Sequence, residues 1–176
     1  MKIGLLSICI IVVMLLSSCS NLILFTKNTR DSLIKNHQDI SEVQFYNSDK
    51  IVLKRNLSKD ETQVAKGVIV LENGKYFEEI VIPKQTRGVV TKEGPGYLRI
   101  AFEEGDKRNL RFDINKNQEY QISADKWKNN FGTVKYDTTV YYIMPSSSRA
   151  LLMVHKEYIY NSEKRKRVVK GRQVAR

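Results

Sequence analysis

Short runs of β-branched, aromatic and aliphatic residues recur along the chain from Ile40 onward, and turn-forming residues end each run. In the run 110–114, apolar and charged side chains alternate, so one face of such a strand lies in a core and the other in water. Asn73-Gly74 separates two runs and favours a type I′ hairpin. A second hairpin is expected between 97–102 and 110–114. This pattern predicts a mainly β fold, an antiparallel meander forming a small barrel or sandwich.

The remaining expected elements follow from the same signals. Further strands are expected at 43–46, 51–55, 88–92, 120–123, 133–136, 139–144, 150–155 and 157–160. Little helix is expected beyond a short one at 29–36, a capped turn at 58–61 and a turn at 125–130. Pro83 and Pro145 are expected to close strands, because proline donates no ladder hydrogen bond. The predicted core comprises Val52, Val68, Val70, Ile80, Ile82, Val89, Leu98, Ile100, Phe102, Leu110, Phe112, Ile114, Ile122, Tyr142, Leu152 and Val154.

The N-terminus carries one positive residue, Lys2, followed by an apolar run at 3–16. A bilayer-spanning helix needs about 20 apolar residues, so this run has the length of a signal-peptide core and is short for a permanent span. The apolar residues at 22–25 keep open the alternative of a retained signal anchor. The polar stretch 17–21 interrupts that longer span.

The residues after the apolar run read Leu16-Ser17-Ser18-Cys19. This stretch resembles the lipobox of bacterial lipoproteins, which has an aliphatic residue, two small residues and a cysteine. The resemblance implies that signal peptidase recognises Leu16, Ser17 and Ser18, and that Cys19 receives lipid, such as palmitate, after cleavage. Cys9 is the other cysteine and lies in the signal segment, so the processed chain has no disulfide. The abundance of Lys, Asn, Ile and Tyr is typical of a low-GC genome, such as that of a Bacteroidota species.

The resemblance also implies an address and a domain organisation. Ser20 follows the cysteine, in a position where an acidic residue would favour the inner membrane or the cell surface. We therefore expect a lipid anchor in the outer membrane and a domain facing the periplasm. The expected segments are a signal peptide with its signal helix at 1–18, a lipidated tether at 19–39, a β-rich domain at 40–162 and a basic tail at 163–176.

The chain has a net charge of +11, and much of it lies near the C-terminus. The tail residues expected to contact an anionic surface are Lys164, Arg165, Lys166, Arg167, Lys170 and Arg172. Export removes nucleic acid as a partner and leaves anionic lipid, lipid A or acidic cell-wall polymer. The alternative is a solvated tail, or a charged edge strand formed around Val168-Val169.

Catalytic and metal-binding patterns are missing from the sequence. The two histidines, His37 and His155, are not at metal-ligand spacing, and Ser146-Ser147-Ser148 reads as a polar loop after Pro145. We therefore expect no catalytic residues, no metal, no cofactor beyond the lipid on Cys19, and a non-enzymatic binding or scaffolding module. A lipocalin-like barrel for a small apolar ligand and an unrecognised envelope enzyme are the alternatives. The tyrosines of the C-terminal third are read mainly as cross-strand pairs.

Overall fold

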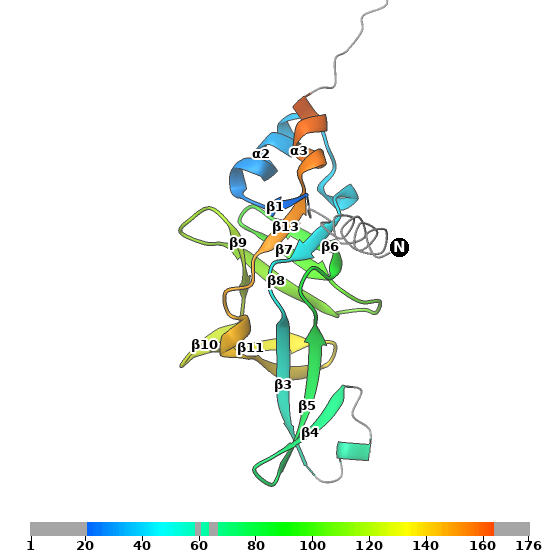
Figure 1. Ribbon diagram of the computed structural model, residues 1–176, viewed down its shortest axis with the longest axis vertical. Helices are drawn as coiled ribbons and strands as arrows, with labels where there is room; N and C mark the ends of the chain where they lie inside the picture. The colour runs from blue at the N-terminus through cyan, green and yellow to red at the C-terminus, as the bar shows by residue number, and fades with distance from the viewer. Residues whose placement is uncertain (1–20, 59–60, 64–66, 164–176) are drawn as a thin grey trace, which may run out of the picture.

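The computed structural model describes residues 21–58, 61–63 and 67–163, with side chains placed as far as Ile159. Its strands form two antiparallel sheets, in the orders β1-β13-β2-β6-β7-β8-β9 and β10-β11-β12-β3-β5-β4. The prediction of a mainly β, antiparallel fold is confirmed, and the two sheets agree with a sandwich-like arrangement. Figure 1 shows an elongated molecule with helices α2 and α3 side by side at one end.

The seven-stranded sheet holds most of the core. Its strands are β1 (Leu22–Leu24), β2 (Phe45–Asn47), β6 (Arg87–Gly94), β7 (Tyr97–Ala101), β8 (Asn109–Ile114), β9 (Tyr120–Ser123) and β13 (Leu152–His155). Two isolated bridges, Thr26↔Glu119 and Gln121↔Leu151, join segments at opposite edges of this sheet. The sheet therefore curls around its apolar face, which Phe45, Leu98 and Phe112 fill without solvent exposure.

The six-stranded sheet continues into an arm. Its strands are β3 (Ile51–Leu57), β4 (Val68–Glu72), β5 (Lys75–Ile82), β10 (Lys126–Lys128), β11 (Phe131–Tyr136) and β12 (Thr139–Ile143). In Figure 1 the distal parts of β3, β4 and β5 project away from the helical end. Few elements cover the arm, so Val68 and Leu71 on its edge strand are 63% and 61% exposed.

The segment expected to be a tether belongs largely to the folded domain. β1 pairs with β13, and Phe25 and Leu33 are fully buried. Helix α2 (Lys27–Lys35) begins after Thr26, whose Oγ1 accepts a hydrogen bond from the Thr29 N–H at 3.2 Å, as an N-cap does. β1 and α2 therefore lie in the folded domain, ahead of the expected boundary at residue 39, and the polar sequence concealed two widely spaced apolar residues that enter the core.

Both predicted hairpins are confirmed. Asn73 and Gly74 have φ values of 49° and 74°, as a type I′ turn requires, between β4 and β5. β7 and β8 pair over their whole length. The turn expected at 125–130 is instead a third hairpin between β10 and β11, in which Asn129 and Asn130 both have positive φ.

The strand predicted at 157–160 is wrong, because this segment lies in helix α3 (Lys156–Glu163). The Tyr-Ile-Tyr sequence matches strand alternation, but tertiary contacts favour the helix. Tyr158 packs against the core, and its hydroxyl accepts a hydrogen bond from the Gln44 N–H at 3.4 Å. Three 3-10 turns, η1 (Ile40–Glu42), η2 (Glu61–Gln63) and η3 (Pro145–Ser147), complete the described elements.

Most residues of the predicted core are buried or pack against the core, with four exceptions. Val70 of β4 is only partly buried and does not pack against the core. Val68, Val89 and Tyr142 are 63%, 51% and 47% exposed. In β12 the alternation has the opposite phase to the one expected, so Tyr141 is buried and Tyr142, opposite Lys54 of β3, faces outward. Val89 faces out because Gly88 and Val90 occupy the inner positions of β6.

Several sequence predictions lie outside the described residues. They are the signal segment with its lipobox and Cys19, and the basic tail from Lys164 onward with its possible edge strand. None of the helices in the part of the chain that the structure describes is long and apolar enough to cross a membrane.

Candidate anion-binding site

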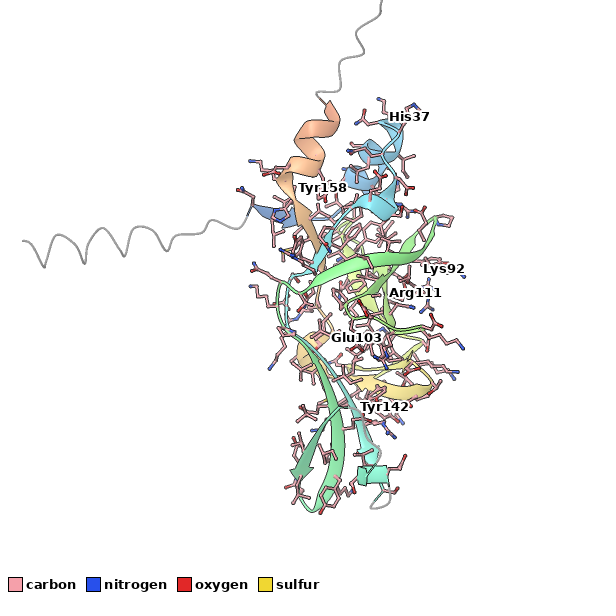
Figure 2. All side chains as sticks on the ribbon, turned by 90° about the vertical axis from the view of Figure 1, so that its right-hand side faces the viewer. His37, Lys92, Glu103, Arg111, Tyr142 and Tyr158 are labelled. Carbon is pink, nitrogen blue, oxygen red and sulfur yellow. The ribbon has the colours of Figure 1, made fainter. Side chains whose placement is uncertain are left out.

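Basic residues form a row on the outer face of the seven-stranded sheet. Lys92 of β6 lies directly opposite Arg99 of β7, and Arg99 lies opposite Arg111 of β8. Ser123 of β9 continues the row beyond Arg111. Figure 2 shows Lys92 and Arg111 close together on one side of the molecule, between the helical end and the arm. Like charges directly opposite each other destabilise a sheet, so this row is not explained by stability.

An irregularity in β6 places Lys92 in this row. The register of β6 and β7 shifts between Val90 and Lys92, so Lys92, and not Thr91, is the partner of Arg99. A bulge inserts one residue and re-aims the side chains that follow it. Thr91 Oγ1 donates a hydrogen bond to the Arg99 carbonyl oxygen at 3.3 Å, which holds the irregular segment against β7. The bulge therefore adds a cation to the two arginines.

The row forms one wall of an open hollow of about 530 Å³ between the two sheets. Its lining residues are Lys92, Arg99, Lys107, Asn109, Leu110, Arg111, Ser123, Asp125, Val134, Lys135 and Asp137. Five of these carry positive charge and two carry negative charge. A concave surface with one predominant sign of charge raises the local concentration of oppositely charged ligands.

Most of the cations in the hollow are not neutralised by the protein. Within the described residues, Lys92, Lys107, Arg99 and Lys135 form no ion pair. The Arg99 side chain is oriented by a 3.2 Å hydrogen bond from Nη1 to Asn109 Oδ1. These side chains therefore have charge available for a ligand.

Arg111 is held more rigidly than the lysines. Its Nε donates to Asp113 Oδ1 at 2.7 Å, and its guanidinium lies 4.3 Å from the centre of the Tyr97 ring. Stacking on an aromatic face and a hydrogen bond through Nε orient the planar group. A pre-oriented guanidinium loses less freedom when it binds a carboxylate or phosphate.

Replacing Lys92 with glutamine is expected to raise the free energy of unfolding by about 0.2–1 kcal/mol, because it removes the like-charge pair with Arg99. Chemical denaturation at low and high salt measures this, and salt should shrink the gain. Lys116→Gln is the control, since Lys116 is an exposed loop residue outside the row. Equal effects of the two substitutions would mean that the row carries no repulsion.

A second hollow, of about 480 Å³, shares Asp137 with the first and lies at the root of the arm. Here the charges are paired. Glu78, 1% exposed, accepts hydrogen bonds from Arg55 Nε at 2.6 Å, from the Tyr141 hydroxyl at 3.0 Å and from the Gly67 N–H at 2.6 Å. Burial and the bond to Glu78 raise the pKa of Tyr141 to about 12. This cluster fastens β3, β5 and β12 together.

The loop after β3 is held to the same cluster by the predicted capping box. The Ser58 N–H and hydroxyl both donate to Glu61 Oε2 at 2.8 Å, and Arg55 Nη1 lies 2.9 Å from Glu61 Oε1. The hydrogen bonds from Ser58, followed by the one from Arg55, lower the pKa of Glu61 to about 2.

The Glu61 carboxyl is therefore expected to titrate near pH 2 and not near its ordinary 4.5. Because the pKa is lower in the folded state, the stabilisation that these contacts provide is present above pH 4.5 and is lost as the pH falls towards 2. Carbon-detected NMR of the Glu61 carboxyl measures the midpoint. Ser58→Ala should raise the midpoint, and a wild-type value near 4.5 would show that the contacts do not form in solution.

The candidate residues from the sequence that fall in the described part lie apart from the hollow. His37 lies in the turn after α2 with φ 55°, and His155 Nε2 lies 3.0 Å from the Tyr46 hydroxyl. Ser147 Oγ accepts a hydrogen bond from the Val52 N–H at 2.9 Å and is fully buried. Among the described residues, no three His, Cys, Asp or Glu side chains gather as metal ligands would.

Sequence reasoning missed the basic row, although one signal was present. The predicted hairpin places Arg99 and Arg111 on the outward, charged face of facing strands. Their register depends on the loop length, and Lys92 joins them only through the bulge in β6. No protein-family model, no curated protein and no solved structure matches this chain.

Proposed function

We propose that this chain is a lipid-anchored, non-enzymatic module of the bacterial cell envelope that binds an anionic envelope component through the basic row. The observation that supports binding most is the register of Lys92, Arg99 and Arg111. Three cations placed side by side do not stabilise the sheet. A bound ligand that neutralises them would stabilise the folded protein. The excess of positive charge in the hollow supports an anion as the ligand.

The lipobox resemblance supports the lipid anchor, and the fold indicates which end of the domain such an anchor would hold near the membrane. Strand β1 begins at Leu22, three residues after Cys19. A fully extended chain covers at most about 3.6 Å per residue, so a lipid on Cys19 would hold Leu22 within about 11 Å of the membrane. The end of the domain that carries β1, α2 and α3 would then face the lipid, and the arm would project away from it.

The proposed location is the outer membrane, facing the periplasm, because Ser20 and the residues after it are not acidic. The partner class is anionic lipid, lipid A or an acidic cell-wall polymer. The basic tail from Lys164 onward follows α3, so it would start at the membrane-facing end, where each cation adds about 1 kcal/mol of attraction to an anionic surface. Nucleic acid is not among the proposed partners.

Packing of the interior makes the lipocalin-like alternative less attractive. The apolar face of the seven-stranded sheet is occupied by Leu98, Ile100, Leu110 and Phe112, each at most 1% exposed. A small apolar ligand would have to displace these side chains, whereas an anion finds the basic hollow already formed.

Metabolic labelling with a clickable palmitate analogue tests the anchor. We expect label on the wild-type chain and none on Cys19→Ala, which should also leave the membrane fraction. An unlabelled wild-type chain would contradict the lipid anchor.

Calorimetric titration of the intact chain in neutral detergent with pyrophosphate tests the anion site. We expect binding that weakens at least tenfold in the double variant Lys92→Gln/Arg99→Gln and is unchanged in Lys84→Gln/Lys116→Gln, which removes the same charge elsewhere. Equal binding by both double variants would contradict a site at the basic row.

A further inference from the structure

The basic row differs in shape from a site for one small anion. Lys92, Arg99 and Arg111 lie on three neighbouring strands in one line perpendicular to the strands. Adjacent strands are about 4.7–4.9 Å apart, so the positions that carry these charges repeat at about that interval. Cations that converge on one point are typical of a site for a single phosphate, whereas a line of cations matches a line of anions.

We infer that the ligand of this row is a linear acidic polysaccharide that lies across strands β6, β7 and β8, with successive negative groups facing successive cations. This inference rests on the proposed function, because it names the class of anion for the same site. Several weak contacts along one chain raise the effective concentration of the next contact, so affinity grows with ligand length.

The size of the hollow agrees with a polymer segment. Its volume is about 530 Å³, within the range of sites that enclose molecules much larger than a phosphate ion. Lys107, from the connection between β7 and β8, and Lys135, from β11, extend the positive lining beyond the row. A ligand that contacts all five cations must therefore reach from one sheet to the other.

The other lining residues favour a carbohydrate over a polymer made only of phosphates. The carboxylates of Asp125 and Asp137 can accept hydrogen bonds from the hydroxyl groups of a ligand, and they repel a closely spaced chain of phosphates. Asn109 and Ser123 offer uncharged donors and acceptors between the cations. The hydroxyl groups of a sugar chain, which lie between its acidic groups, can form hydrogen bonds with both the carboxylates and the uncharged polar side chains.

The second hollow continues from the first, and its charged lining residues are paired within the protein. It shares Asp137 with the basic hollow and includes Thr138 and Thr139. Its arginines are engaged by carboxylates of the protein, Arg55 by Glu78 at 2.6 Å and Arg108 by Asp137 at 3.5 Å. A polysaccharide that leaves the row past Asp137 therefore meets hydroxyls and paired charges, which suit neutral sugar units.

The test measures how the intact chain, in neutral detergent, binds galacturonate oligomers of two and eight residues. The methyl-esterified octamer, in which the carboxylates are neutral, pyrophosphate and a polyphosphate of eight units serve as comparisons. We expect the octamer to bind at least tenfold more tightly than the dimer and pyrophosphate, and more tightly than the polyphosphate. The ester should not bind measurably.

Variants connect the result to the row. Lys92→Gln and Arg99→Gln should each weaken the octamer several-fold and reduce its salt dependence, and Lys116→Gln should change neither. Asp125→Asn should strengthen polyphosphate binding more than octamer binding, because the Asp125 carboxylate repels phosphate groups but does not repel the neutral hydroxyl groups of a sugar.

The outcomes separate the two proposals. Equal affinity for pyrophosphate and the octamer would overturn the polymer inference and leave the anion site standing. Tighter binding of polyphosphate than of the octamer would overturn the carbohydrate assignment in the same way. If the ester binds as well as the octamer while pyrophosphate still binds, only the inference is wrong. If no anion binds the intact chain, both the inference and the proposed anion site are wrong.

Discussion

Replacing Phe25 with alanine is expected to lower the free energy of unfolding by about 3–5 kcal/mol, as large-to-small substitutions of buried aromatic residues do. Phe25 is fully buried, and its ring lies 4.9 Å from that of Phe45 and 5.2 Å from that of Tyr120. Its backbone N–H donates to the Leu152 carbonyl of β13 and its carbonyl accepts from the Tyr120 N–H of β9, so it links two strands that are far apart in the order of the sheet. Urea denaturation followed by tryptophan fluorescence measures the change.

Leu24→Ala is the matched control, since Leu24 is the neighbouring residue and is 39% exposed. It should lower stability by much less than Phe25→Ala. A flexible tether before residue 39 would make the two substitutions equally mild, and that result would contradict the place of β1 and α2 in the domain.

Replacing Glu78 with alanine is expected to lower the free energy of unfolding by about 3–5 kcal/mol, because it removes the buried partner of Arg55 and leaves that arginine only the more exposed Glu61. Arg55, with its side chain 18% exposed, would lose its contact through Nε, and the Tyr141 hydroxyl and the Gly67 N–H would lose their acceptors. Denaturation curves measure the loss, and amide hydrogen exchange should show it concentrated in β3, β5 and β12.

Glu79→Ala provides the comparison on the opposite face of the same strand. Glu79 lies 3.2 Å from Lys54, which keeps Glu72 at 2.7 Å when Glu79 is removed. We expect a loss of about 1 kcal/mol or less. The double variant Arg55→Met/Glu78→Leu should recover part of the stability, because apolar residues leave no unpaired buried charge. If Glu78→Ala and Glu79→Ala lowered the free energy of unfolding by similar amounts, the Glu78 cluster would not be what holds β3, β5 and β12 together.

The features that the sequence predicts well are local. Asn73-Gly74 defines a type I′ hairpin because both residues tolerate positive φ, and the alternation in 110–114 places Leu110 and Phe112 inward. The Ser58 and Glu61 capping box needs only a spacing of three residues. Such signals depend on interactions between residues close together in the sequence, so they can be recognised without knowledge of the tertiary structure.

The features that the sequence predicts poorly depend on distant partners. In β12 the adjacent residues Tyr141 and Tyr142 are equally suited to the core, and the partners that hold Tyr141 inside, such as Glu78, are distant in the sequence. The helix α3 forms because Tyr158 packs against elements more than a hundred residues earlier. The basic row requires two strand registers and a bulge, which no local pattern near Lys92 reveals.

The folded position of β1 also changes how an anchor on Cys19 would act. A long tether would let the domain sample many orientations, whereas β1 three residues from Cys19 would keep the helical end beside the lipid. The basic row lies on the side of the molecule between this end and the arm, so it would remain open to a polymer that runs along the membrane.

Two-dimensional amide NMR of the intact chain during titration with pyrophosphate tests the anion site most directly. We expect saturable shifts concentrated at Lys92, Arg99, residues 107–111 and Lys135, with small changes at the helical end and in the arm. The shifts should disappear in Lys92→Gln/Arg99→Gln and persist in Lys84→Gln/Lys116→Gln. Shifts that spread over all exposed lysines, or the absence of any saturable change at the row, would contradict a binding site on this face of the sheet.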